Sequence, residues 1–579
     1  MKDYFQLRKN LKKDFSKLPL IKMAVLGDTA TQFLCNTIRA LGCEKKLNIE
    51  IWEADYNQIE TQILVNSSEL YKFNADIIVL FFATHKLLDS YNKLNPSQYN
   101  TLALTEKERI IKLLDIIKEN TSAQVIIYNY YHINDAVFGS YGLKTESSFI
   151  FQLHKLNYEL MTLATQRKDM LLCDISTLKS WIGEKTFFQP SLYLNSDMVL
   201  SLDVLPEVAS RTVDIVCSLN ARIKKCVIID LDNTIWGGLI GEDGIENIQI
   251  GTLGIGKAFT EFQHWLKKLK NRGIILAVCS KNDENIAKEP FEKHPDMVLK
   301  LDDIAVFIAN WNNKAENIKE IQKLLNIGFD SMVFIDDSAF ERGMVRQLIP
   351  EVSVPEMPED PACFLQYLYE INLFETCSFS EEDAKRTHHY KIETQRKLSQ
   401  QTFSDENDYL KMLDMFSLVE HFNSFNIPRV AQLSQRSNQF NLRTVRYTED
   451  VLEKIAISEE FFTFAFSLND KFGENGLICI IILQKENEKT LFVDTWLMSC
   501  RVLKRGMEQF SLNTIARFGL NNGFSFIKGE YIPTLKNSMV KEHYKNLGFT
   551  KNNGSWILNL HDFKEIETYI CKKISNQEY

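Results

Sequence analysis

The sequence predicts a multidomain α/β protein, and three observations support this fold class. The chain has 579 residues, which is more than one hydrophobic core organises and corresponds to about three or four domains. Short apolar segments alternate with amphipathic ones over most of its length, as in proteins that wind helices around parallel strands. Several apolar segments also end in polar residues, and the carboxyl ends of parallel strands are where such sheets place their chemistry.

Composition and charge exclude several functional classes. The hydrophobic fraction of 45% and the charged fraction of 25% are those of an ordinary globular protein. A net charge of −9 and a pI near 5.7 argue against a broad nucleic-acid surface. The charged N-terminus lacks the apolar core of a signal peptide, and the longest apolar runs, Ile77–Ala83 and Leu477–Leu483, are too short to cross a bilayer. Eleven cysteines without a CxxC pair fit a reducing compartment. We therefore expect a cytoplasmic protein without nucleic-acid or membrane partners.

Residues 1–219 are predicted to form a first doubly wound domain. Four apolar segments in this region read as buried parallel strands separated by helical patterns. The expected strands are Ile21–Leu26, Ala75–Ala83, Gln124–Asn129 and Met170–Asp174.

The turn after the first strand, Gly27-Asp28-Thr29, resembles the nucleophile turn of SGNH hydrolases, where a serine stands at the position of Thr29. The block that should supply the histidine reads Asp174–Thr177 and contains none. Since a hydroxyl nucleophile needs a neighbouring base, we expect a degenerate domain with a binding or structural role, and an active esterase is the less favoured alternative. The remaining histidines of the region do not match the pattern: His85, His132 and His154.

Residues 220–358 carry the strongest signal, which begins with Cys226–Gly238, CVIIDLDNTIWGG. An apolar, β-branched strand ends here in Asp230 and Asp232. Residues i and i+2 lie on the same side of an extended strand, so both carboxylates can face one site. Two carboxylates held close together indicate a cation between them or a shared proton. A surface turn is the alternative for this stretch alone, because Asp, Asn and Gly are common turn residues.

Later segments of this region deliver further polar groups at strand and helix ends. An amphipathic helix around 259–269 ends at Asn271–Gly273, and the strand Ile274–Cys279 after it is followed by Ser280. Lys314 stands at a helix start, and the strand Ser331–Ile335 ends in the pair Asp336-Asp337. Phosphoryl transfer needs an acceptor carboxylate, Mg²⁺ on hard oxygen ligands, and cationic and hydroxyl donors for the phosphoryl oxygens. The inventory therefore predicts a phosphoryl-transfer site.

In this order the motifs resemble those of the haloacid dehalogenase (HAD) superfamily, and the resemblance implies a role for each residue. Asp230 is expected to be the nucleophile that forms an aspartyl-phosphate, and Asp232 the general acid and then base. Ser280 and Lys314 are expected to hold the phosphoryl group. The expected Mg²⁺ ligands are Asp230, the main-chain carbonyl of Asp232, Asp336 and Asp337.

The gaps between these motifs predict an open site. About 50 residues separate Asp230 from Ser280, and about 34 separate Ser280 from Lys314. Neither interval has room for a folded cap domain, which would otherwise close over a small substrate and exclude water. We expect bulky substrates, or another protein domain, to reach the site.

Residues 359–423 are predicted to form a helical linker, and residues 424–579 a last α/β domain. Its expected strands include Phe462–Ser467 and Thr490–Met498, followed by a helix over Gly506–Leu520. This order resembles the GNAT acyltransferase fold, in which a turn before a helix N-terminus cradles a pyrophosphate with backbone N–H groups. The corresponding turn is Arg501–Gly506, with Lys504 where the family's first glycine stands.

The combination of an uncapped HAD domain and a GNAT-like domain resembles the FkbH-like family. The motifs that carry this resemblance are SKND (280–283), SNQFN (437–441) and SCRVLKRGME (499–508). The resemblance implies an enzyme that takes a glyceryl group from 1,3-bisphosphoglycerate, removes phosphate, and loads the acyl unit onto the phosphopantetheine thiol of an acyl carrier protein. The candidate residues for the acyl or pantetheine site are Cys279, Cys500, Arg501, Gly506 and Asn537. For each cysteine, a small buried apolar role is the favoured alternative.

Two other functional classes remain open. The chain could be a plain phosphatase that acts on a phosphorylated metabolite or polysaccharide precursor without acyl transfer. Alternatively, the outer domains could form an interaction scaffold around a vestigial HAD core.

Overall fold

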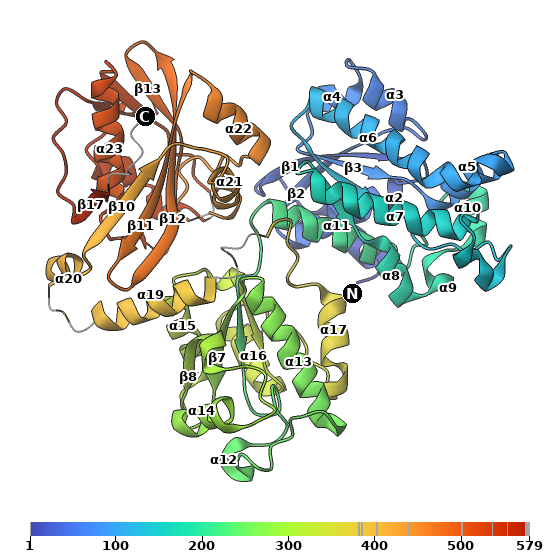
Figure 1. The fold of residues 1–579 in the computed structure, drawn as a ribbon, viewed down its shortest axis with the longest axis horizontal. Coiled ribbons are helices and arrows are strands. Elements are labelled where there is room, and N and C mark those ends of the chain that lie inside the picture. The colour runs from blue at the N-terminus through green and yellow to red at the C-terminus, as the bar shows by residue number, and fades with distance from the viewer. Residues whose placement is uncertain are drawn as a thin grey trace. The chain divides into compact units, whose positions relative to one another are not determined.

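The computed structural model describes residues 2–379, 383, 386–400, 403, 405–437, 439–499, 502–534, 536–552 and 554–573. The chain divides into two compact units, Met1–Ser218 and Leu219–Tyr579, whose strands and flanking helices are drawn in Figure 1. Parallel sheets with helices occur in both units, which confirms the predicted α/β class. The finer division of the chain into four domains stays a prediction. Among the residues given above, no helix is long and apolar enough to cross a membrane.

The first unit is a parallel sheet of five strands in the order β2-β1-β3-β4-β5. Four of its strands are the predicted ones: β1 (Leu20–Gly27), β3 (Ile77–Phe81), β4 (Gln124–Tyr128) and β5 (Met170–Cys173). The sequence did not indicate β2 (Asn48–Glu53), an edge strand in which glutamates alternate with apolar residues. Its principal helices are α2 (Gln32–Glu44), α6 (Leu102–Asn120), α7 (Phe149–Gln166) and α11 (Leu205–Leu219).

The second unit begins with a four-stranded parallel sheet in the order β8-β7-β6-β9. Its strands are β6 (Cys226–Ile229), β7 (Ile275–Ser280), β8 (Ile304–Ala309) and β9 (Met332–Ile335), and the sequence did not indicate β8. Alternate residues of β6 enter two separate cores: Val227 and Ile229 lie in one, Cys226 and Ile228 in the other. The flanking helices are α13 (Gly254–Asn271), α14 (Glu284–Lys293), α15 (Lys314–Leu325) and α16 (Ala339–Leu348).

The strand register places the predicted site residues at one edge of this sheet. Ile229 at the end of β6 pairs with Val278 on one side and with Ile335 on the other. Asp230 and Asp336 directly follow the paired residues Ile229 and Ile335, so the two aspartates lie next to each other at the end of the sheet. β7 ends at Ser280, which pairs with Ala309 of β8. All of these groups therefore meet at the carboxyl edge, where α/β sheets bind ligands.

No cap domain stands between these motifs. Every residue from 231 to 313 is described, and between β6 and β7 this segment contains the short α12 (Ile240–Asp243) and α13. Between β7 and Lys314 it contains α14, one 3₁₀ turn and β8. Apart from the four-residue α12, whose first N–H contacts Asp232, the segment that follows β6 reaches α13 without a further helix or strand.

The C-terminal part of the second unit is built on a mixed sheet of eight strands, ordered β15-β16-β14-β13-β12-β11-β10-β17. Its long central strands are β11 (Phe461–Asp470), β12 (Gly473–Asn487) and β13 (Thr490–Met498). The outer strands are β10 (Met415–Glu420), β14 (Phe526–Gly529), β15 (Thr550–Asn552), β16 (Ser555–Asn559) and β17 (Ile570–Lys573). Two helices precede this sheet in the chain: α17 (Phe364–Ile371), which packs in the core of the four-stranded sheet, and α19 (Arg386–Gln400), which packs against β8. The further helices are α20 (Glu406–Met412), α21 (Ile427–Arg436), α22 (Glu449–Ile457), α23 (Met507–Asn521) and α24 (His543–Asn546).

Candidate active site

A buried lysine between two carboxylates forms the centre of the site. The Lys314 ammonium lies 2.9 Å from Asp230 Oδ1 and 2.6 Å from Asp336 Oδ2. Lys314 is 3% exposed, Asp230 6% and Asp336 0%. Charged groups at such depth persist only when they are paired. Asp337, the next residue, is exposed and completes a group of three aspartates whose ligand atoms lie within 4.8 Å of one another.

Burial controls the ionisation of these groups. It raises the pKa of Asp230 to about 6, although the Lys314 charge acts in the opposite direction. Burial also raises the pKa of Asp336 and of Asp337. Burial alone would lower the pKa of Lys314, but the neighbouring carboxylates of Asp230 and Asp336 outweigh it and raise that pKa. The lysine is therefore a permanent cation, and added positive charge beside the carboxylates would lower their pKa again.

Asp232 is held in one orientation by three donors. Its Oδ1 accepts hydrogen bonds from Trp236 Nε1 at 2.8 Å and from the Ile240 backbone N–H at 3.0 Å. Its Oδ2 accepts from the Asn282 side-chain amide at 2.9 Å. The Asp232 carboxylate is not part of the three-aspartate group. The two aspartates of the first motif thus have different environments, as their predicted roles require.

Ser280 and Thr234 connect the remaining motif residues. Asn282 Nδ2 also donates to Ser280 Oγ at 3.2 Å, so one amide links the second strand end to Asp232. The Thr234 hydroxyl donates to Asp337 Oδ1 at 3.3 Å and accepts from the Asp337 backbone N–H at 3.2 Å. These contacts fix the exposed aspartate against the loop that follows β6.

Sequence reasoning gave no role to three residues of this arrangement: Trp236, Asn282 and Arg342. Arg342 donates to the backbone carbonyls of Asp336 and Asp337 at 2.9 and 2.6 Å, so it fixes the backbone of the acidic pair. The sequence contained a signal for two of them, since Trp236 and Asn282 lie within four residues of Asp232 and Ser280. Nothing local indicated Arg342.

The donor set fits a divalent cation of the Mg²⁺ type. Such ions take hard oxygen ligands, and the three-aspartate group offers carboxylate oxygens only. Three carboxylates meet here beside a single ammonium, that of Lys314, so the group carries an excess of negative charge. A bound divalent cation would balance this excess. Asp230, Asp336 and Asp337 are the residues that would hold the ion.

The acyl site stays a prediction, and the structure places three of its five residues. Cys279 is fully buried, its Sγ lies 3.7 Å from the Lys314 backbone carbonyl, and burial raises the pKa of its thiol. Such surroundings disfavour the reactive thiolate. Cys500 and Arg501 lie outside the described residues. Asn537 is fully buried, and Gly506 is the N-cap of α23.

The first unit contains no hydrolase triad around Thr29 in the part of it that is described. The Thr29 hydroxyl donates to the backbone carbonyl of Asp197. His85 Nδ1 lies 2.8 Å from the Tyr131 hydroxyl, and its ring stacks on Phe188 with centroids 4.2 Å apart. Burial lowers the pKa of His85 to about 4, with the Lys179 charge acting in the same direction. These contacts are those of a packed structural histidine, and the resemblance to SGNH hydrolases stays a prediction.

Comparisons with known proteins add two findings. Residues 22–217 match the family model described as FkbH, N-terminal domain. A crystal structure of the N-terminal part of BF1531 from Bacteroides fragilis, which contains a phosphatase domain complexed with Mg, is 52% identical in sequence. That match covers 66% of this chain and 100% of the other, with a TM-score of 0.63. No curated protein matches the chain.

Two acetyltransferase structures also match part of the chain at much lower similarity. The ribosomal-protein-S18-alanine N-acetyltransferase of Escherichia coli is 13% identical and covers 28% of this chain and 99% of its own, with a TM-score of 0.20. The spermidine N-acetyltransferase of Vibrio cholerae is 13% identical and covers 25% of this chain and 96% of its own, also with a TM-score of 0.20. At this level of similarity, the activities of these two enzymes are not assigned to this chain.

Replacing Lys314 by Ala should destabilise the protein most strongly when no divalent cation is present. The change leaves two buried carboxylates without their shared cation, which costs about 3–5 kcal/mol. Added Mg²⁺ should restore part of the loss, because the ion supplies the missing charge. Thermal unfolding with and without Mg²⁺ measures both effects. Lys319→Ala, at an exposed position of the same helix, is the control, and equal melting temperatures for the two variants would contradict this account of the site.

Proposed function

The chain belongs to the same family as BF1531 of Bacteroides fragilis, and on that premise we propose that it is a Mg²⁺-dependent phosphatase with Asp230 as nucleophile. The observation that carries the proposal is the buried group of Asp230, Asp336 and Lys314, with Asp337 at its exposed side. A carboxylate nucleophile, hard oxygen ligands and a fixed cation are what aspartate-based phosphoryl transfer requires.

The chemistry proceeds in two displacements. Asp230 attacks the phosphorus atom of the substrate, a carboxylate–phosphorus bond forms, and the bond from phosphorus to the leaving oxygen breaks. Asp232 gives its proton to that leaving oxygen. In the second step Asp232 takes a proton from a water molecule, the resulting hydroxide attacks the aspartyl-phosphate, and inorganic phosphate leaves while Asp230 is regenerated. Bound Mg²⁺ supplies positive charge that offsets the repulsion between the nucleophile and the phosphoryl oxygens.

The surrounding residues position these two aspartates. The Asp232 carboxylate is fixed by hydrogen bonds from Trp236, Ile240 and Asn282. The proton that Asp232 transfers therefore starts from a defined position. Ser280 Oγ, held by the same Asn282 amide, is a hydroxyl donor for a phosphoryl oxygen. Lys314 presents a permanent positive charge beside the nucleophile. Because these groups are already in place, little reorganisation accompanies the reaction.

The finer proposal concerns the substrate and the acceptor. We infer that the substrate is 1,3-bisphosphoglycerate and that the glyceryl unit goes to the phosphopantetheine thiol of an acyl carrier protein. The thiolate attacks the acyl carbon, a carbon–sulfur bond forms, and the C1 phosphate leaves as inorganic phosphate. The phosphoryl group at C3 is then transferred to Asp230, the C3 oxygen takes the Asp232 proton and stays on the glyceryl unit as a hydroxyl, and the aspartyl-phosphate is hydrolysed as described above.

Two observations support this assignment over a plain phosphatase. Residues 22–217 match the FkbH N-terminal domain, whose family resemblance implies the glyceryl transfer. The carboxyl edge also has no cap domain between residues 231 and 313, so a group attached to a protein can reach Asp230. The phosphatase alone, acting on a phosphorylated metabolite, remains the second candidate, and it is favoured by the phosphatase domain of BF1531.

Asp230→Asn should lower the rate of phosphate release by about a thousandfold or more, because an amide does not act as a nucleophile towards phosphorus. Asp232→Asn should slow release by about a hundredfold to ten-thousandfold, with an aspartyl-phosphate on Asp230 that outlives that of the unchanged protein. Phosphate release and acid-stable trapping of the phosphoenzyme measure the two effects. Asp302→Asn, at a position that is 98% exposed and paired with Lys391, is the matched control. Undiminished turnover by Asp230→Asn would falsify the mechanism.

Chelation of divalent cations should stop phosphate release, and added Mg²⁺ should restore it. Asp337→Asn should leave the fold intact but require a higher Mg²⁺ concentration for half-maximal rate, since it removes one ligand charge at the exposed side of the group. A Mg²⁺ titration of both proteins measures this shift. Full activity in the chelator would rule out a metal-dependent site.

Incubation with 1,3-bisphosphoglycerate and a holo acyl carrier protein should add one glyceryl group to the carrier, as read by mass spectrometry. Phosphate release without a carrier adduct would overturn the transfer and leave the phosphatase. If neither product forms, with or without Mg²⁺, the chain acts as a scaffold. The control carrier lacks its phosphopantetheine arm and should gain no mass.

A further inference from the structure

The turn between β13 and α23 keeps the backbone shape that its sequence predicts. Gly506, the N-cap of α23, has a φ of 83°. Lys504 stands where the GNAT pattern has a glycine. It nevertheless adopts a φ of 63°, a backbone angle that residues other than glycine rarely adopt. The geometry that could cradle a pyrophosphate at a helix N-terminus is therefore present, and the question is what occupies it.

Another part of the chain packs against Gly506, at the end of this turn. The Thr568 hydroxyl donates to the Gly506 carbonyl at 3.2 Å, and a Cβ built on Gly506 would lie 3.0 Å from that hydroxyl oxygen. Arg505, the cation nearest the helix N-terminus, is buried and forms ion pairs with Glu393 and Asp470. Its guanidinium charge is already neutralised within the protein.

Glu508 supplies an anion of the chain's own at the same place. It lies in the first turn of α23, where a negative charge is stabilised by the helix dipole and the free N–H groups. Burial raises the pKa of Glu508, while the backbone N–H groups of Glu508 and Lys504 act to lower it. Glu508 directly follows the N-cap Gly506 and Met507, and this position places its charge in the first turn of α23.

The pantetheine arm of a coenzyme at this turn would need a free strand edge, because its amides pair as a peptide does. β13 has none. β12 pairs along one side of it, and β14 pairs along the other at Thr490–Phe492. Beyond these residues the same side is closed by 440–442, with Leu442 N–H donating to Trp496 O at 3.3 Å and Met498 N–H donating to Phe440 O at 3.0 Å.

The closing segment is part of the core and is fixed from its other side. The Ile532 backbone N–H donates to the Leu442 carbonyl at 2.9 Å, and the buried Asn537 amide donates to the Asn441 carbonyl at 3.0 Å. Phe440 is 4% exposed and Leu442 0%. Displacing this segment would expose two large apolar side chains, so a ligand cannot take its place cheaply.

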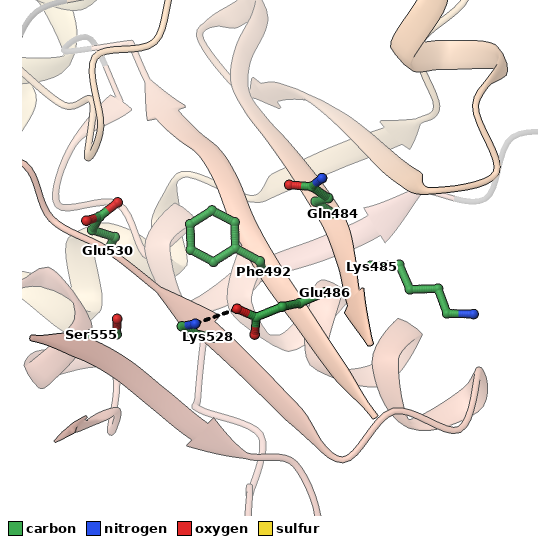
Figure 2. Close-up of a pocket in the computed structure, with 7 residues that line it drawn as sticks. All are labelled: Gln484, Lys485, Glu486, Phe492, Lys528, Glu530 and Ser555. Atoms are coloured by element: carbon green, nitrogen blue, oxygen red, sulfur yellow. Dashed lines mark hydrogen bonds and ion pairs between the residues drawn. The ribbon is translucent and has the colours of Figure 1, made fainter. Parts of the chain in front are cut away.

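The C-terminal sheet also has an open hollow of about 470 Å³, shown in Figure 2. Its charged groups are paired within the protein: Lys528 with Glu486, Lys485 with Glu488, and Glu530 with Arg443. Because no excess of positive charge faces this hollow, it offers no alternative cradle for a pyrophosphate.

We infer that the C-terminal domain takes no coenzyme A or acyl-coenzyme A at the turn before α23, because residues 440–442 occupy the strand edge where the pantetheine arm of such a ligand would pair. Coenzyme A does not fit the residues present: Thr568 also packs against Gly506, and Glu508 adds a negative charge to the first turn of α23. Any acyl transfer by this chain therefore uses a thiol presented from outside this turn, a consequence that rests on the proposed function.

Coenzyme A, titrated to about 1 mM into the full chain with Mg²⁺, should leave hydrogen exchange of residues 502–510 and 439–443 unchanged. Saturable protection of either segment would overturn the inference. Protection confined to the loops around Asp230 would mean that the coenzyme's phosphates bind the phosphatase site, and it would support a closed turn. Phosphate release is measured in the same samples, so a failure of the proposed function is detected separately.

Glu508→Ala tests the internal anion directly. We expect faster hydrogen exchange of residues 502–510 and a lower melting temperature, because the free N–H groups of the first turn lose a nearby negative charge. Glu459→Ala, an exposed glutamate of the same domain, should change neither. If Glu508→Ala exchanges at the rate of the unchanged protein, the carboxylate does not occupy the turn and the inference fails.

Discussion

The contact of Lys314 with Asp230 and Asp336 is the constraint on which the phosphoryl site depends. A buried ammonium must be paired, and two buried carboxylates must share a cation, so neither sign is tolerated without the other. This mutual requirement explains why the strand ends are so closely aligned. β6 and β9 must finish at the same level for one lysine to reach both aspartates. The arrangement holds charge ready for a phosphoryl group before any substrate arrives.

Much of this site was predictable because its information is local. An apolar strand followed at once by aspartate identifies a strand end, and parallel strands bring their ends together whatever the loops do. The contacts of Asn282 and Arg342 were not predictable, because they depend on how loops from different strands approach one another. β8 was missed for a different reason: its apolar run carries no catalytic residue directly after it, so no chemical motif drew attention to it.

The C-terminal domain shows the opposite limit of sequence reasoning. The motif from 499 to 508 correctly indicated a turn before a helix, and even Lys504 adopts the glycine-like backbone angle. What the motif could not indicate is the occupant of the turn. Thr568 and Glu393 come from distant parts of the chain, and they meet the turn only after the whole domain has folded. A local pattern specifies a backbone shape, whereas the ligand of that shape is decided by tertiary contacts.

The charges around Arg505 suggest what the turn does in place of binding a coenzyme. Arg505 and Arg396 share Glu393 and Asp470 in a buried four-charge cluster. Arg396 and Glu393 belong to α19, which also packs against β8 of the phosphatase sheet. A cluster of this kind loses several kcal/mol when one partner is removed, so it ties the turn firmly to α19. The turn therefore connects two parts of the second unit, and the carboxyl edge at Asp230 is left as the place where an external thiol or phosphate ester can reach the reacting groups of this chain.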